Sequence, residues 1–77
     1  MKQNLKMAKV ITMKVEMNSK YFMNIVTTVD PIVTPEMAFR MYGLKGRIIK
    51  SEETNVMPLP FALLHSANLQ KNMSNIF

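Results

Sequence analysis

The chain has 77 residues, of which 48% are hydrophobic and none is cysteine, and its ten Lys and Arg residues against five Asp and Glu residues give a formal net charge of +5. This composition excludes wholesale disorder, disulfide bonds, thiolate metal sites and cysteine nucleophiles, and no run of about 18 apolar residues is present that could span a membrane. We therefore expect a single domain over residues 1–77, in the cytoplasm and with no membrane partner.

The small size and the charge both predict partners. A domain of this length buries only about 60–65% of the surface that its unfolded chain exposes. Since no disulfide adds stability, we expect it to pair with another copy as a homodimer. The excess of positive charge predicts an anionic partner, with RNA first and an acidic protein surface second. The alternative is a solvated basic face that only keeps the protein in solution.

The chain is expected to open with a flexible basic N-terminal arm, residues 1–8, which mixes Lys, Gln, Asn and Met without a clear period. The next segment, VITMKVEM, alternates, and its apolar odd positions are Ile11, Met13, Val15 and Met17. A period of two is typical of a strand with one buried face. This segment is the clearest strand of the sequence.

A second apolar segment, YFMNIVTTV, follows a break at NSK, and the two strands predict a β-hairpin. A three-residue loop would place Met13 opposite Ile25, which keeps the apolar odd positions on one face. A two-residue loop would place Met13 opposite Asn24. Because a slip of one residue turns the apolar set to the wrong face, we expect the three-residue loop. Its third position usually carries Gly or Asn, and here it carries Lys20.

The segment TPEMAFRMYG contains the signals for both ends of a short helix. Thr34 can cap the first turn with its hydroxyl, Pro35 suits the first helical position, and Gly43 can take the left-handed conformation that ends a helix. The apolar stripe that we expect to lie on the sheet comprises Met37, Met41 and Leu44, with Ala38 beside them.

After the helix, residues 46–57 are expected to return as one irregular third strand along the hairpin, although the adjacent Ile48 and Ile49 blur the alternation. The pair Glu52 and Glu53 could instead be a turn between two short strands.

A stiff connector, Pro58 to Pro60, leads to a final segment with the composition of a helix, whose apolar face is expected to contain Ala62, Leu69, Met73 and Ile76. The predicted fold class is α+β: a small antiparallel sheet, made of a β-hairpin plus a third strand, with one short helix packed on it and a C-terminal helix (β-β-α-β-α).

The sequence lacks the pattern of a catalytic or metal site. The single histidine, His65, lies in a leucine-rich segment with no carboxylate within a helical turn. Glu52 and Glu53 are adjacent, so on a strand they point to opposite faces and cannot act together on one substrate. A metal ion needs several converging His, Cys or carboxylate ligands. We expect no enzyme activity, no metal and no cofactor.

Basic residues on and beside the predicted sheet are the candidate site. The nucleic-acid-binding residues that we expect are Lys14, Lys20, Lys45, Arg47 and Lys50. Together with Lys2, Lys6 and Lys9 they could form one basic surface, which would bind phosphates with little readout of base sequence. Exposed aromatic side chains among Tyr21, Phe22 and Tyr42 would add base stacking. The alternative for these aromatics is core packing, which we expect for Phe22 and also for Phe39.

A short, basic, cysteine-free chain rich in Met, Asn, Lys and Ile, with a β-β-α-β-α plan, resembles the small accessory proteins that T-even-type bacteriophages make early in infection. Within that group it is similar to inhibitors of RNA-cleaving toxins of toxin–antitoxin systems. The resemblance implies a non-catalytic counter-defence protein in the host-cell cytoplasm, which binds a bacterial host or defence protein and works with RNA. Lys14, Lys20, Lys45, Arg47 and Lys50 are compatible with that role.

A second hypothesis needs no nucleic acid. The Met-rich apolar content, with nine methionines, and the lack of disulfides also suit a dimeric interaction or assembly factor that docks only on protein. Its contacts would come from a sheet edge or from the C-terminal helix.

Overall fold

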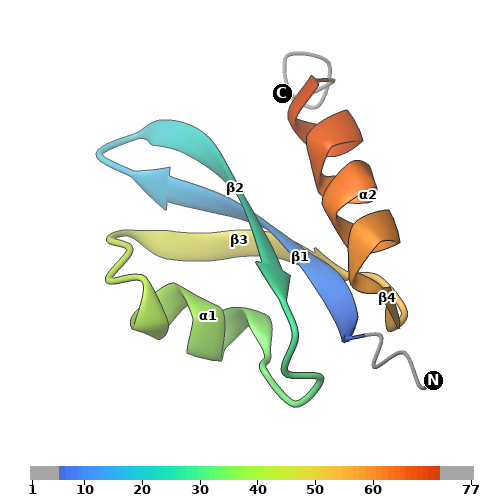
Figure 1. Ribbon diagram of the computed structural model, residues 1–77. Helices are drawn as coiled ribbons and strands as arrows, with labels where there is room; N and C mark the ends of the chain where they lie inside the picture. Colours follow the sequence, from blue (N-terminus) through green and yellow to red (C-terminus); the bar gives the residue numbers. More distant parts are fainter. Residues whose placement is uncertain (1–5, 72–77) are drawn as a thin grey trace, which may run out of the picture.

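The computed structural model describes residues 6–71, and Figure 1 shows a twisted sheet with two helices. The elements along the chain are β1 (Met7–Met17), β2 (Lys20–Thr28), α1 (Pro35–Met41), β3 (Arg47–Glu53), β4 (Met57–Pro58) and α2 (Leu59–Lys71). The predicted α+β class is confirmed, with the order β-β-α-β-β-α. Within residues 6–71, neither helix has the length and apolar character needed to cross a membrane.

β1 is the central strand of an antiparallel sheet. The strand order is β2-β1-β3, and β4 pairs with the first residues of β1, beyond the end of β3. The expectation of one third strand over residues 46–57 is therefore wrong, because the chain forms two strands there. At the break, the Thr54 side chain accepts a hydrogen bond from the backbone N–H of Val10 at 2.9 Å, and this bond replaces a regular ladder bond between strands.

The two faces of β1 pack against different helices. α1 contacts β1 and β3, whereas α2 contacts β1 and β2 (Figure 1). On the α1 side, the buried core comprises Ile11, Met13, Val15, Val33 and Ala38. On the α2 side, it comprises Ala8, Val10 and Ala62. Because side chains alternate between the faces of a strand, odd-numbered β1 residues serve the α1 side and even-numbered ones serve the α2 side.

The hairpin register differs from the expected one. Met17 pairs with Lys20, which leaves a two-residue loop, and Met13 lies opposite Asn24. Asn18 and Ser19 both have positive φ, 55° and 63°. These values are those of a tight turn whose twist matches that of the flanking strands, so turn geometry decides the register.

The expected register assumed that the apolar residues of β2 share one face of the sheet, but β2 has apolar residues on both faces. Val26 packs against the core on the α1 side, and Ile25 packs against the core on the α2 side. If β2 shifts by one residue, apolar side chains still reach both cores. The shift therefore loses less buried apolar surface than it would in a strand whose second face is polar. Phe22, expected in the core, pairs with Val15 and is 43% exposed.

The predicted caps of α1 are confirmed, and its buried face is confirmed for Ala38 and Leu44 only. Thr34 accepts a hydrogen bond from the backbone N–H of Met37 at 3.2 Å, and Gly43 has a φ of 62°. The N–H of Leu44 donates to the carbonyl of Phe39 at 3.1 Å, a terminating turn that brings these two side chains together. They pack on the core with buried Ala38, whereas Met37 and Met41, expected there, are exposed.

α2 lies on the opposite side of the sheet from α1. Its buried residues are Ala62 and Ser66, and Leu69 packs beside them one turn further on. Ala62 and Leu69 were expected on this face, and that expectation is confirmed. Pro60 stands in the first turn, where its missing N–H breaks no helical bond. Met73 and Ile76 lie outside the described residues.

The N-terminal segment is more ordered than the expected arm. β1 begins at Met7, and Ala8 is 2% exposed, so both belong to the sheet. Lys9 is not part of a basic surface. Its side chain is 9% exposed and lies 2.6 Å from Glu53 on β3, and it also donates to the carbonyl of Pro31 at 2.8 Å. Residues 1–5 of the expected arm lie outside the described part of the chain.

Two glycines after α1 allow a matched test of backbone strain. A Cβ on Gly46, which has a φ of 104°, would lie 2.3 Å from the carbonyl oxygen of Glu16, whereas a Cβ on Gly43 would meet nothing within 4 Å. Both alanine variants incur the left-handed penalty of about 1–2 kcal/mol. Only Gly46→Ala must also move β3 away from β1. In urea unfolding followed by circular dichroism, we expect Gly46→Ala to lose at least 1 kcal/mol more than Gly43→Ala. Equal losses would show that the close approach to Glu16 is unimportant.

The Lys9–Glu53 pair gives an asymmetric prediction. Glu53→Ala leaves the buried ammonium group of Lys9 with one carbonyl partner, and we expect it to lower the free energy of unfolding by about 2 kcal/mol. This loss is smaller than for fully buried pairs because the Glu53 side chain is 37% exposed. Lys9→Met removes the buried charge itself and fills similar space, so we expect a loss of less than about 1 kcal/mol. The same urea measurement compares them. A larger loss for Lys9→Met would contradict this account.

Candidate functional site

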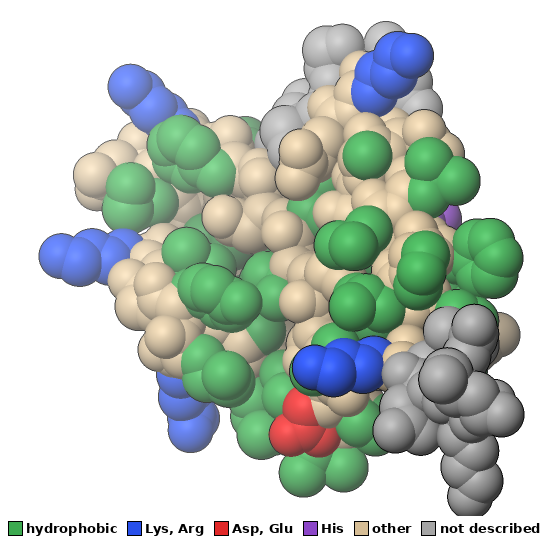
Figure 2. All heavy atoms as spheres, viewed as in Figure 1, with side chains coloured by type: hydrophobic (Ala, Val, Ile, Leu, Met, Phe, Trp, Pro, Cys, Tyr) green, Lys and Arg blue, Asp and Glu red, His purple; other side chains and the backbone are tan. Residues whose placement is uncertain are grey.

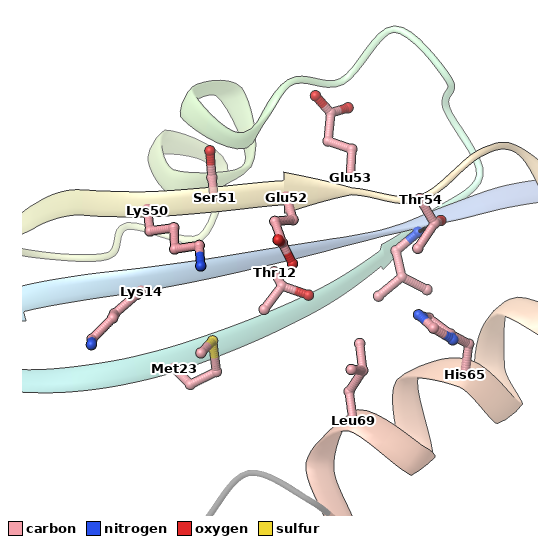
Figure 3. Close-up of a pocket in the computed structure, with 11 residues that line it drawn as sticks. Thr12, Lys14, Met23, Lys50, Ser51, Glu52, Glu53, Thr54, His65 and Leu69 are labelled. Atoms are coloured by element: carbon pink, nitrogen blue, oxygen red, sulfur yellow. Dashed lines mark hydrogen bonds between the residues drawn. The ribbon is translucent and has the colours of Figure 1, made fainter. Parts of the chain in front are cut away.

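A groove of about 640 Å³ lies between α2 and the part of the sheet that α2 leaves uncovered. We call it the sheet groove. The side chains that define it come from β1, β2, β3 and α2, and they are Thr12, Lys14, Met23, Lys50, Glu52 and His65. Figure 3 shows these side chains on the α2 side of the sheet, while Ser51 and Glu53 of β3 point to the other side. The expected divergence of Glu52 and Glu53 is therefore confirmed.

Strand pairing explains which side chains face the groove. Lys14 lies directly opposite Lys50, and Thr12 lies opposite Glu52. The β1–β3 ladder has an irregularity next to Lys14, where Ile49 is an extra residue in β3. Such a bulge shifts the following residues by one position, and it accounts for the consecutive isoleucines that blurred the sequence pattern.

The electrostatics of the groove centre on two like charges. Lys14 and Lys50 are cross-strand neighbours, and like charges in directly opposite positions destabilise a sheet. The ammonium group of Lys14 also lies 5.1 Å from the ring centroid of Tyr21, in a cation–π contact, and Tyr21 is 52% exposed. Glu52 adds one negative charge to the same wall of the groove.

The structure brings together two of the five expected nucleic-acid-binding residues. Lys14 and Lys50 line the sheet groove. Arg47 lies on the same side of the sheet but forms an ion pair with Glu16, with 2.5 Å between the guanidinium nitrogen and the carboxylate oxygen.

The other two expected residues lie elsewhere. Lys20 is the first residue of β2, at the tip of the hairpin, and its pairing with Met17 assigns it to the α1 side. Lys45 is exposed in the connection between α1 and β3. In the view of Figure 2 the Lys and Arg side chains stand apart from one another, with hydrophobic side chains between them. Lys9 is buried, and Lys20 and Arg47 lie on opposite sides of the sheet, so these three residues do not share one basic surface.

The α2 wall of the groove was not predicted from the sequence. His65 is exposed and lines the groove, with Leu69 one turn further along the same helix. Leu69 was expected on the face that packs against the sheet, and four residues is one helical turn. That spacing was the signal that could have placed His65 beside the sheet.

The groove is lined mainly by side chains that can donate hydrogen bonds. Among residues 6–71, no group of three or more His, Cys, Asp or Glu side chains could hold a metal ion. The groove instead offers two ammonium groups, the Thr12 hydroxyl and the His65 imidazole, all of which can donate hydrogen bonds to an anion. Comparison with protein-family models, curated proteins and solved structures found no match to this chain.

Proposed function

We propose that the chain is a small non-catalytic binding protein that holds the backbone of single-stranded RNA in the sheet groove. The observation that carries the proposal is the direct opposition of Lys14 and Lys50 across β1 and β3. Two ammonium groups in this position repel each other, and a phosphate between them would turn that repulsion into two favourable contacts. Lys50 and His65, which line the groove, are exposed, so an extended chain has access to it.

Tyr21 extends the proposed site towards the β2 edge. Tyr21 is 52% exposed and lies on the α2 side of the sheet, beside Lys14. A base can stack on an exposed aromatic ring whatever its identity, and this typically contributes about 1–3 kcal/mol per base. Lysine contacts phosphate as a point charge. The combination therefore favours unpaired RNA with little sequence preference.

Glu52 limits where the RNA backbone can lie. It occupies the same side of β3 as Lys50, opposite Thr12. A phosphate near Glu52 would meet a like charge, so the backbone is expected to pass on the Lys14 and Tyr21 side of Lys50. A uniform basic surface would not restrict the path of the RNA backbone in this way.

Two pairs of lysines of equal charge test the site. Lys14→Gln/Lys50→Gln removes the groove cations, and Lys20→Gln/Lys45→Gln removes the same charge elsewhere. In fluorescence titrations of nuclease-treated protein with a single-stranded RNA oligonucleotide, the groove variant is expected to bind at least about tenfold more weakly than wild type. The log–log salt slope should fall by about 1.4, for two lost phosphate contacts.

The hairpin-tip and loop variant is the matched control and should keep most of the affinity. Equal losses in the two double variants would show that only net charge matters, and no binding by wild type at low salt would refute the RNA proposal. Circular dichroism of each variant is the control for correct folding.

The resemblance to phage counter-defence proteins supports a proposed use of this binding, which is inhibition of an RNA-cleaving toxin of a toxin–antitoxin system. An inhibitor that holds RNA would act together with RNA on the bacterial defence protein, without chemistry of its own. In cells that express such a toxin, wild type is expected to restore growth, and Lys14→Gln/Lys50→Gln is expected to fail while accumulating normally. Rescue by both would place the inhibitory contact outside the sheet groove, and rescue by neither would refute this role.

A further inference from the structure

Within residues 6–71, no strand pairs with the outer edge of β2. β2 has nine residues and, among the described residues, pairs only with β1. Every second residue of such a strand directs its backbone N–H and C=O away from its neighbour. Edge strands are usually blunted by charges, proline, bulges or short length. β2 contains no proline, its register with β1 is regular, and its one charged residue, Lys20, stands at the end.

The opposite edge of the same sheet shows the protection that β2 lacks. β3 has seven residues and an irregularity in its register with β1. Four of its residues are charged: Arg47, Lys50, Glu52 and Glu53. Since both edges belong to one small sheet, the contrast marks β2 as the edge that is available for pairing.

The surroundings of β2 are apolar and incompletely covered. None of its residues is buried, and Phe22 is 43% exposed on the α1 side. A shallow hollow of about 240 Å³ runs along residues 24–27 and is bounded by Leu44 and by Tyr42, which is 61% exposed. An added strand would continue the sheet here and bring further side chains over these groups.

We propose that the strand added to β2 is the β2 strand of a second copy, antiparallel about a two-fold axis at Asn24. This register places Phe22 opposite Val26 of the other copy, and aromatic–β-branched pairs of this kind stabilise sheets. Lys20 falls opposite Thr28 of the other copy, so no like charges meet. A two-fold axis uses the same edge on both copies, so neither copy retains a free β2 edge.

The small core adds a reason for self-pairing. The largest fully buried side chains are Ile11, Met13, Val10 and Val15, and all belong to β1. The remaining buried hydrophobic residues are Ala8, Val33, Ala38 and Ala62. A dimer adds apolar burial to a chain that has little of its own, and its stability then depends on protein concentration.

The pairing does not rest on the proposed RNA function, although it would extend it. A two-fold axis perpendicular to the sheet keeps the α2 sides of both copies on one face. Tyr21, on the α2 side of β2, would then lie between the groove of its own copy and the second copy. Nuclease-treated protein is used for the test, so that RNA cannot bridge two copies and failure of either proposal is seen separately.

Two substitutions that flank the same β1 residue make a matched test. Met13 pairs with Asn24 on β2 and with Ser51 on β3. Asn24→Asp would place two carboxylates face to face across the two-fold axis, and Ser51→Asp adds the same charge at the other edge. By sedimentation equilibrium, we expect a wild-type dimer, an approximately fivefold weaker dimer for Asn24→Asp, and little change for Ser51→Asp. A monomeric wild type, or equal weakening by both, overturns the proposal.

Two single-cysteine variants test the same interface if Asn24→Asp is unstable. The chain has no cysteine, so a single substitution gives one thiol per copy. Residues directly opposite each other on antiparallel strands lie within disulfide range. Mild oxidation is expected to link Asn24→Cys into a covalent dimer and to leave Ser51→Cys largely unlinked. Linking of Ser51→Cys to the same extent or more would overturn the β2 interface.

Discussion

The fold depends on one strand that is buried on both faces. β1 pairs with β2, β3 and β4 and contacts both helices. Val10 and Ile11 are adjacent, point to opposite sides of the sheet, and are each 0% exposed. Since α1 and α2 pack on opposite faces of β1, each helix needs to be apolar on one side only. This is how a chain with few large buried side chains forms two separate cores.

The sheet groove follows from the same arrangement. α2 packs over Ala8 and Val10, near the start of β1, and its contacts there bury Ala62. The later even-numbered β1 positions, Thr12 and Lys14, lie beyond this contact and are polar. The site is therefore built on paired strands, whose backbone bonds fix the spacing of its side chains, and the helix supplies only one wall.

Local signals in the sequence predicted more than long-range ones did. The caps of α1 were predictable because Thr34 and Gly43 act on backbone groups a few residues away. The hairpin register was not, because the positive φ values of Asn18 and Ser19 outweigh an apolar pattern that β2 divides between two faces. The groove pair Lys14 and Lys50 depends on the β1–β3 register, which local sequence does not specify.

The start of β1 also constrains the order in which the chain can fold. β1 and β2 are joined by a tight turn and can pair early, but the first residues of β1 wait for segments made much later. Leu59 donates its N–H to the carbonyl of Lys6 at 2.8 Å, and Thr54 donates to the carbonyl of Val10 at 3.0 Å. Loop closure of this length is slow compared with hairpin formation. On the ribosome, an apolar strand end therefore stays uncovered until residues 54–59 have left the exit tunnel, so the sheet is completed only after these residues emerge.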